Sequence, residues 1–263
     1  MSRLQRPLLR PRPFPPRAAR RSLCRDGRAG GRRTSLGGIR VADALIELGG
    51  VHFAYDGAAA VLADADFRLD TGQRTALVGP TGSGKTTLLH LMVGLLHPTA
   101  GTIRLFGRER RSEADFADVR GRVGLLFQDA EDQLFCPTVA EDVAFGPLNQ
   151  GKTHSEAVAI VRETLASLGL SGYEDRVTYR LSGGEKRLVS LATVLAMGPE
   201  VLLLDEPTTG LDERTVERIV DILSHLPQAM VIISHHRDFL DRVTDRTVEL
   251  RDRRLQVCQP PAQ

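Results

Sequence analysis

Long hydrophobic runs are absent from the sequence. Nowhere do about 18 apolar residues follow one another, which is the length that a helix needs to cross a bilayer. Cysteine is scarce as well, with Cys24, Cys136 and Cys258 far apart in the chain. Such thiols make neither a disulfide framework nor a C-x-x-C metal site, so we expect a reducing, cytoplasmic setting. A role at a membrane would therefore depend on a membrane-embedded partner.

The overall composition is that of an ordinary soluble globular protein. Of the 263 residues, 41% are hydrophobic and 26% are charged, which excludes a chain that is disordered throughout. The length suits one large α/β domain or two smaller domains that fold without disulfides.

Positive charge is concentrated at the beginning of the chain. Residues 1–40 contain twelve arginines and one acid, Asp26, whereas the net charge of the whole chain is only +2. The remaining residues are therefore acidic overall. This distribution argues against a uniformly basic surface for binding nucleic acid.

Residues 1–43 are rich in arginine, proline and glycine and have no apolar periodicity, so we predict a disordered extension. We favour a mis-assigned start, with Val41 at or near the true beginning of the protein. A transit peptide and an arm that touches RNA or lipid are the alternatives. We expect the globular domain over residues 44–256 and a short tail over 257–263.

The globular part begins with strand patterns and continues with strands that alternate with helices. Strands are predicted at 45–48, 51–55, 65–69, 75–78, 123–127, 201–205, 230–234 and 246–250. Helices are predicted at 155–168, 185–197, 213–226 and 238–243. This alternation is typical of an α/β fold with a parallel sheet that is covered on both faces.

A glycine-rich motif follows the predicted strand 75–78 and matches the P-loop pattern G-x-x-x-x-G-K-[ST]. Its backbone N–H groups and the next helix N-terminus suit phosphate groups. Lys85 would reach the β- and γ-phosphates, and Thr86 would bind Mg²⁺. An incidental glycine-rich turn is the alternative. The expected nucleotide-binding residues are Gly79, Pro80, Thr81, Gly82, Ser83, Gly84, Lys85, Thr86 and Thr87.

Lysine is rare in this chain, which strengthens the P-loop prediction. Of 35 basic residues only Lys85, Lys152 and Lys186 are lysines, so arginine is used wherever charge alone suffices. A P-loop requires a compact ammonium group, not a planar guanidinium fork. A lysine at position 85 is therefore what phosphate chemistry predicts.

The most apolar predicted strand, 201–205, ends in the acid Asp205, and a second acid, Glu206, follows it. A strand of this composition is buried on both faces, and ligands bind beyond the carboxyl ends of such strands. Asp205 would hold hydrated Mg²⁺, and Glu206 would polarise an attacking water. A pair of helix-capping acids is the alternative, which Pro207 and Thr208 make less favourable.

The run Leu181-Ser-Gly-Gly-Glu185 precedes a predicted helix and narrows the class. It resembles the signature of the ATP-binding cassette family. The resemblance implies a mostly parallel core sheet, an N-terminal antiparallel β subdomain and a helical subdomain at about 129–185. It also implies that two cassettes pair head to tail, with each ATP between one P-loop and the partner's Ser182, Gly183 and Gly184.

Four further positions match this family. Tyr55 resembles the aromatic residue that stacks on adenine, and Gln128 resembles the lid glutamine that contacts Mg²⁺ and water. Asp212 resembles the loop aspartate that crosses the dimer interface, although alone it would suit a helix N-cap. His235 resembles the histidine that senses the γ-phosphate. Family members usually have aspartate next, where this chain has His236, and we favour His235 because Ser234 fits the residue before the switch.

The segment 128–147 resembles the ATPases of energy-coupling-factor importers, which include cobalt and nickel importers. In that family this region forms the groove that grips a helix of the membrane partner. Leu134, Phe135, Val139 and Phe145 would form its apolar floor. An ordinary core of the helical subdomain is the alternative, and both interpretations can hold together.

Together these motifs predict an ATPase that uses ATP and Mg²⁺ at the cytoplasmic face of the membrane. The expected partners are a second cassette, identical or related, an integral membrane transport subunit and a substrate-binding membrane component. Cobalt or nickel is the expected cargo, with a vitamin as the alternative. A soluble cassette that acts on nucleic acid and a non-catalytic scaffold are the rival functions, and we expect no nucleic acid partner.

Overall fold

A four-stranded antiparallel sheet opens the described part of this computed structural model, residues 44–258. The expectations for the extension 1–43, for a start near Val41 and for residues 259–263 lie outside these residues. The strands are ordered β2-β1-β4-β5. Their bounds are Ala44–Ala54 for β1, Ala60–Asp70 for β2, Ala100–Leu105 for β4 and Arg108–Glu109 for β5.

Strand β1 is continuous, whereas the sequence predicted two strands on either side of a glycine pair. Its two halves pair with the same neighbour, β2, and the register shifts between Leu48 and Val51. Gly50 has a φ of 53°, and a Cβ on Gly101 would lie 2.2 Å from the Gly50 carbonyl oxygen. The glycines therefore allow a bulge and a close approach of β4, and they do not end the strand.

The second sheet has six strands in the order β10-β9-β3-β8-β7-β6. The pairs β9/β3, β3/β8, β8/β7 and β7/β6 are parallel, and β10 pairs with β9 antiparallel. The bounds are Arg74–Val78 (β3), Val123–Leu126 (β6), Val201–Asp205 (β7), Ala229–Ile233 (β8), Arg246–Arg251 (β9) and Arg254–Cys258 (β10). Strand β10 was not predicted, and it carries the fold two residues past the expected boundary at 256.

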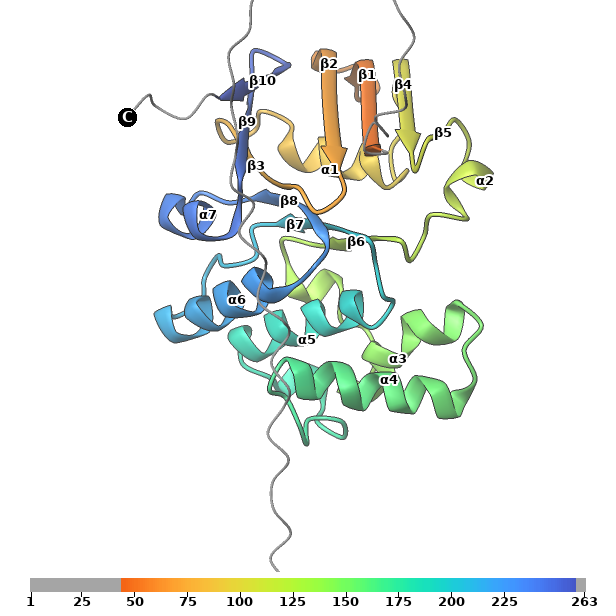
Figure 1. Cartoon of the computed structure of the whole chain (residues 1–263), viewed down its shortest axis with the longest axis vertical. Helices are drawn as coiled ribbons and strands as arrows, with labels where there is room; N and C mark the ends of the chain where they lie inside the picture. Colours follow the sequence, from red (N-terminus) through yellow and green to blue (C-terminus); the bar gives the residue numbers. More distant parts are fainter. Residues whose placement is uncertain (1–43, 259–263) are drawn as a thin grey trace, which may run out of the picture. The chain divides into compact units, whose positions relative to one another are not determined.

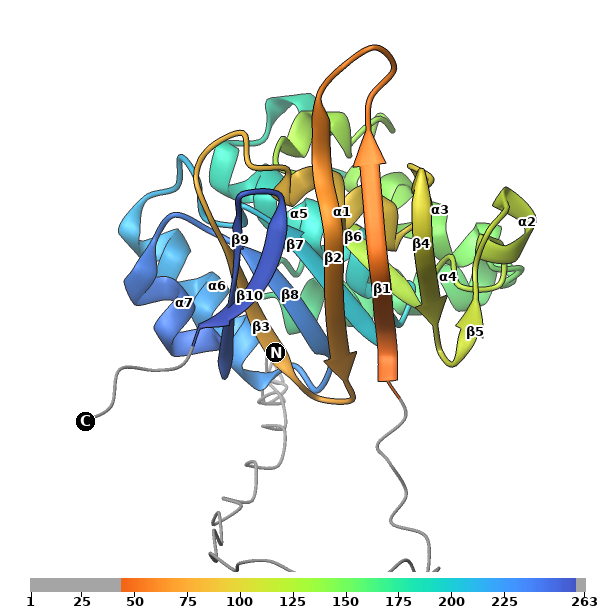
Figure 2. The same ribbon diagram turned by 90° about the horizontal axis from the view of Figure 1, so that it is seen from above.

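Helix α1 (Lys85–Met92) lies between the two sheets, and the larger helices cover the opposite face of the six-stranded sheet (Figures 1 and 2). Side chains along the central strands alternate between these layers. Leu203 packs into the core around α1, whereas Leu202 and Leu204 pack into the core between the sheet and the helices on its opposite face. The period of two in a strand thus builds two hydrophobic cores from one sheet. Both the mostly parallel core sheet and the antiparallel subdomain were expected.

The covering helices start at polar caps. Ser182 and Thr153 each form a capping box with a glutamate three residues later. The covering helices are α3 (Val139–Asn149), α4 (His154–Ser167), α5 (Gly183–Leu195), α6 (Glu213–His225) and α7 (Arg237–Val243). The short helix α2 (Glu113–Phe116) lies beside β5 instead (Figure 1). None of the helices formed by residues 44–258 has both the length and the apolar composition of a membrane span.

Helix α3 had no helix prediction because Gly146 and Pro147 are poor helix formers. A capping box at Thr138 starts it, and Pro147 lies in its last turn. Helices α3 and α4 lie on the far side of the six-stranded sheet from β1 and β2 (Figure 1). They occupy the segment 129–185, where the resemblance implied a helical subdomain.

Candidate active site

Four adjacent parallel strands end at the same edge of the six-stranded sheet, and the predicted site residues follow them. The glycine-rich loop follows β3, His235 follows β8, Asp205 ends β7 and Gln128 follows β6. In the register, Leu126 pairs with Leu204 and Asp205 pairs with Ile233. Residues from four distant parts of the sequence are therefore side by side, at the edge where α/β sheets bind ligands.

The glycine-rich loop takes a backbone course that few residues other than glycine adopt. Gly79, Gly82 and Gly84 have φ values of 147°, 77° and 103°. A Cβ on Gly84 would lie 2.4 Å from Cγ1 of Val61, and a Cβ on Gly79 would lie 2.4 Å from the carbonyl oxygen of Leu250. Side chains at these positions would therefore force the loop out of its conformation.

The loop curls around the ammonium group of Lys85. Its Nζ donates hydrogen bonds of 2.9 Å to the carbonyl oxygens of Gly79 and Pro80. Burial lowers the pKa of Lys85, and the carboxylates of Glu206 and Asp205 partly offset this effect. The side chain is thus a positive group inside a ring of backbone, as a phosphate-binding lysine should be.

Thr86 and Asp205 bring two oxygen donors together although they come from different elements. Oγ1 of Thr86 donates a hydrogen bond of 2.6 Å to Oδ2 of Asp205. Asp205 is only 3% exposed, and this burial is the main cause of the raised pKa of its carboxyl group. A buried carboxylate beside a hydroxyl is the oxygen-rich set that Mg²⁺ prefers. These residues therefore fit a magnesium ion, which Thr86 and Asp205 would hold.

Glu206 is held in a left-handed backbone conformation, with a φ of 47°. Its N–H donates to the carbonyl oxygen of Ile233 at 3.0 Å, and the residue is 5% exposed. Oε2 accepts a hydrogen bond of 3.0 Å from Oγ1 of Thr209. Oε1 has no hydrogen-bond donor among the described residues, and Nε2 of His235 approaches it to 3.2 Å without the alignment of a hydrogen bond. One carboxylate oxygen is thus fixed and the other is free to accept a proton.

Thr209 was not among the residues predicted for the site. The signal was present, because Thr209 lies three residues after Glu206 and threonine often hydrogen-bonds locally in turns. Without the left-handed backbone at position 206, however, nothing indicated which of Thr208 and Thr209 would face the carboxylate.

Tyr55 lies beside the beginning of α1 despite its distance in sequence. Its hydroxyl is 3.0 Å from Oγ1 of Thr87, and its ring packs edge-on against Phe53 with 4.9 Å between the ring centroids. The residue is 46% exposed. This half-exposed ring next to the P-loop helix suits the stacking role that the resemblance implied.

Gln128 is exposed, and its backbone, not its side chain, is anchored. Its carbonyl oxygen accepts a hydrogen bond from the guanidinium of Arg187 on α5. Gln128 follows the end of β6 by two residues, at the same sheet edge as the end of β7, because Leu126 pairs with Leu204.

The remaining predicted residues form a separate surface at the beginnings of α5 and α6. Ser182 caps α5, and a Cβ on Gly184 would lie 3.1 Å from Oγ1 of Thr215. Asp212 caps α6 by accepting hydrogen bonds from the amide and the hydroxyl of Thr215 at 3.0 and 2.7 Å. Among residues 44–258, no hydrogen bond or ion pair joins the 182–184 run or Asp212 to the P-loop.

The predicted apolar groove has a smaller exposed floor than expected. Phe135 is 65% exposed and Phe145 is 48% exposed, and their rings pack edge to face with centroids 4.8 Å apart. Leu148, one turn beyond Phe145 on α3, is 43% exposed. Val139, in contrast, is fully buried in the helical core, and Leu134 packs against that core. Val139 was therefore wrongly placed in the floor.

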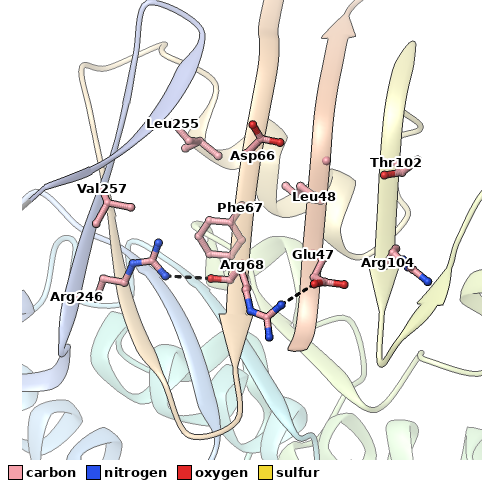
Figure 3. Close-up of a pocket in the computed structure, with 11 residues that line it drawn as sticks. Glu47, Leu48, Asp66, Phe67, Arg68, Thr102, Arg104, Arg246, Leu255 and Val257 are labelled. Carbon is pink, nitrogen blue, oxygen red and sulfur yellow. Dashed lines mark hydrogen bonds and ion pairs between the residues drawn. The ribbon is translucent and has the colours of Figure 1, made fainter. Parts of the chain in front are cut away.

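Two hollows open on this part of the fold. One has a volume of about 970 Å³ and begins at Gly79 and Pro80, with Ser234 and His235 on its wall. The other, of about 580 Å³, lies over β1, β2 and β4 and is bordered by β10 (Figure 3). In it Arg68 pairs with Glu47 at 2.8 Å. No predicted site residue lines this second hollow, so the candidate site is associated with the first.

Known proteins provide an independent comparison with this geometry. A family model described as ABC transporter matches residues 62–209. A Brucella suis protein whose name describes an ABC transporter ATP-binding protein is 53% identical over 195 residues, which are 74% of this chain and 81% of that protein. The cobalt import ATP-binding protein CbiO of Rhodobacter capsulatus is 44% identical over 207 residues, 77% of this chain and 74% of that protein.

A solved structure has the same fold. It is cbiO1 from Clostridium perfringens, part of the ABC transporter complex cbiONQ, with a TM-score of 0.74 and 30% identity. The match covers 81% of this chain and 87% of that one. These matches agree with the P-loop and with the signature run at 181–185. The chain belongs to the ABC transporter family and is an ATP-binding, ATP-hydrolysing subunit.

Proposed function

We propose that this chain is the ATPase of an energy-coupling-factor importer and powers the uptake of cobalt or nickel ions. The observation that carries this choice is the similarity, over most of both chains, to the Rhodobacter capsulatus protein that is named for cobalt import. The same machinery working on a vitamin is the second candidate, because nothing in a cassette touches the cargo.

In this proposal the glycine-rich loop holds the triphosphate of ATP. Gly79 to Thr87 surround the phosphates, and Lys85 exchanges its two carbonyl partners for β- and γ-phosphate oxygens. The half-exposed ring of Tyr55 stacks on the adenine. The buried lysine favours this exchange, since phosphate oxygens compensate its charge better than two carbonyl groups do.

Hydrolysis is assigned to the edge formed by β6, β7 and β8. Glu206 accepts a proton at Oε1 from the attacking water, while Thr209 keeps the carboxylate in place through Oε2. His235 donates from Nε2 toward the γ-phosphate, and Lys85 stabilises the developing charge. Thr86, Asp205 and Gln128 would hold Mg²⁺, which when bound neutralises charge on the phosphate oxygens.

A second cassette completes each site in this proposal. Ser182, Gly183 and Gly184 offer a hydroxyl and backbone N–H groups at the start of α5, and no contact within residues 44–258 directs them to the chain's own P-loop. We assign them to the γ-phosphate that is bound by the other cassette, with Asp212 at the interface. Because this chain carries both halves of the site, a homodimer suffices chemically, and a heterodimer with a related cassette is the alternative.

We assign the exposed patch of Phe135, Phe145 and Leu148 to a helix of a membrane-embedded transport subunit. Three large apolar side chains exposed together are unusual on a surface that contacts only water. Docking there would hold the ATPase peripherally at the cytoplasmic face, in a complex that also contains a substrate-binding membrane component.

The test is ATPase activity of the purified chain alone, with its membrane subunits in liposomes, and with DNA or RNA. We expect stimulation by the membrane subunits and ATP-dependent uptake of cobalt or nickel. Stimulation by nucleic acid alone would replace this proposal with a soluble cassette function. Uptake of a vitamin with no metal uptake would overturn the choice of cargo and leave the ATPase role intact.

A further inference from the structure

A buried arginine ties the Gln128 segment to the helix that follows the signature. Arg187 is the fifth residue of α5 and is 5% exposed. Its Nη1 donates a hydrogen bond of 2.6 Å to the carbonyl oxygen of Phe127, and Nη2 donates to that of Gln128. The planar fork of the guanidinium thus spans two consecutive peptide groups.

A second side chain fixes the same segment from the other direction. Oε1 of Gln133 accepts a hydrogen bond of 3.3 Å from the amide of Phe127. Its Nε2 donates to the carbonyl oxygen of Ser190 at 3.0 Å and to Oγ1 of Thr193 at 2.9 Å, both on α5. Phe127 is therefore bound at both its N–H and its C=O to groups that belong to, or are anchored on, the same helix.

Burial of Arg187 is costly and is not compensated by an ion pair. No carboxylate lies within 4.0 Å of its guanidinium among residues 44–258. Burial lowers the pKa of Arg187, and the more distant carboxylates of Asp129, Asp205 and Glu206 oppose that effect. A buried cation whose close partners are two backbone carbonyls is poorly explained by stability alone, because an apolar side chain would pack there without the desolvation cost.

We propose that Arg187 is a positioning residue for Gln128, which rests on the function proposed above for Gln128 and the signature. The guanidinium holds the Gln128 backbone to the helix whose N-cap is Ser182. Gln128 serves the nucleotide of its own cassette, whereas Ser182 serves the nucleotide of the other. Arg187 therefore makes the lid glutamine of one site and the signature of the second site move together.

The primary test replaces the planar guanidinium group of Arg187 and keeps its positive charge. Arg187→Lys leaves a cation but has only one nitrogen, which cannot hold both carbonyl groups in the same geometry. We expect kcat to fall about 10- to 100-fold with little change in KM, because the ATP-binding loop is untouched. The matched control is Arg218→Lys, since Arg218 on α6 also donates to a backbone carbonyl, that of Leu168, a residue to which the proposal gives no role in the ATP site. This control should keep its kcat within about twofold.

A double-mutant cycle separates positioning from a general structural effect. If Arg187 acts through Gln128, adding Arg187→Lys to Gln128→Ala should lower kcat no further than Gln128→Ala alone. Multiplication of the two effects, or an unchanged kcat in Arg187→Lys, would overturn the proposal.

Hydrogen exchange gives a readout that does not depend on turnover. In Arg187→Lys we expect faster exchange of the amides in 127–133, with the amides of α6 unchanged. If Arg187→Lys does not fold, Gln133→Met tests the same attachment, because it removes the three hydrogen bonds of Gln133. Equal exchange in the variant and the unaltered chain would refute the attachment. Loss of the proposed function would appear instead as an unaltered chain without Mg·ATPase activity, whatever the exchange result.

Discussion

Nε2 of His235 lies 3.2 Å from Oε1 of Glu206, although the two residues follow different strands. The parallel strands β7 and β8 produce this approach, since Asp205 pairs with Ile233 and the Glu206 amide donates to the Ile233 carbonyl. The relationship supports His235 over His236 as the switch residue. His236 instead is the residue before α7, at its N-cap position, and its backbone N–H donates to Oγ of Ser234 at 3.2 Å.

We expect His235→Ala to lower kcat at least about 100-fold, because it removes the imidazole that lies 3.2 Å from Glu206 and that we assign to the γ-phosphate. His236→Ala should keep kcat within about twofold. Steady-state ATPase assays on the two variants measure the difference. The opposite ranking would mean that the register of the switch is shifted by one residue.

Glu206→Gln keeps the shape of the side chain and removes its ability to accept a proton. We expect kcat to fall by about 10²-fold or more while ATP still binds. Two copies should then remain joined around unhydrolysed ATP, which size-exclusion chromatography with Mg·ATP can detect. Hydrolysis at the normal rate would show that Glu206 does not activate water.

Thr209→Val removes the hydroxyl that fixes Oε2 of Glu206 and keeps the branched shape. We expect kcat to fall about tenfold, the effect of losing one hydrogen bond to a charged group, with KM for ATP unchanged. Thr209→Ser retains the hydroxyl and is the control. A fall in both variants would indicate a packing role instead of a positioning role.

Cys136 should be an unreactive thiol at neutral pH. Burial raises its pKa to about 11, and the carboxylate of Asp142 adds to this shift. Because only the thiolate reacts, alkylation by iodoacetamide at pH 8 should be about 100-fold slower than that of an ordinary cysteine. The rate should rise with pH until about 11.

The measurement uses a Cys24→Ser, Cys258→Ser background so that Cys136 is the only thiol. Asp142→Asn should move the titration to lower pH, since it removes the negative charge next to the sulfur. A midpoint near 9 in the unaltered site would contradict the prediction.

Local sequence patterns predicted the parts of the fold that depend on local chemistry. The strand Val201–Asp205 was predicted with its observed bounds, because four consecutive apolar residues followed by an acid are typical of a short strand that is buried on both faces. The P-loop was recognisable for a similar reason. Its glycines and lysine act through the backbone of one short segment.

Other elements had no local signal. In β4 only Ile103 and Leu105 are buried, so most of this short strand is exposed and its apolar pattern is weak. Its position is set by pairing with β1, which sequence periodicity cannot reveal. The same holds for Arg187 and Gln133, whose roles depend on backbone groups that only tertiary packing brings near.

The left-handed backbone of Glu206 sets a limit on how far this protein can be stabilised by substitution. Holding a side chain of that size at a φ of 47° costs roughly 1 kcal/mol. Glycine or asparagine would adopt the same backbone with less strain, but neither could present a carboxylate to water. A substitution at position 206 that raised the melting temperature would therefore remove the carboxylate to which we assign the activation of water.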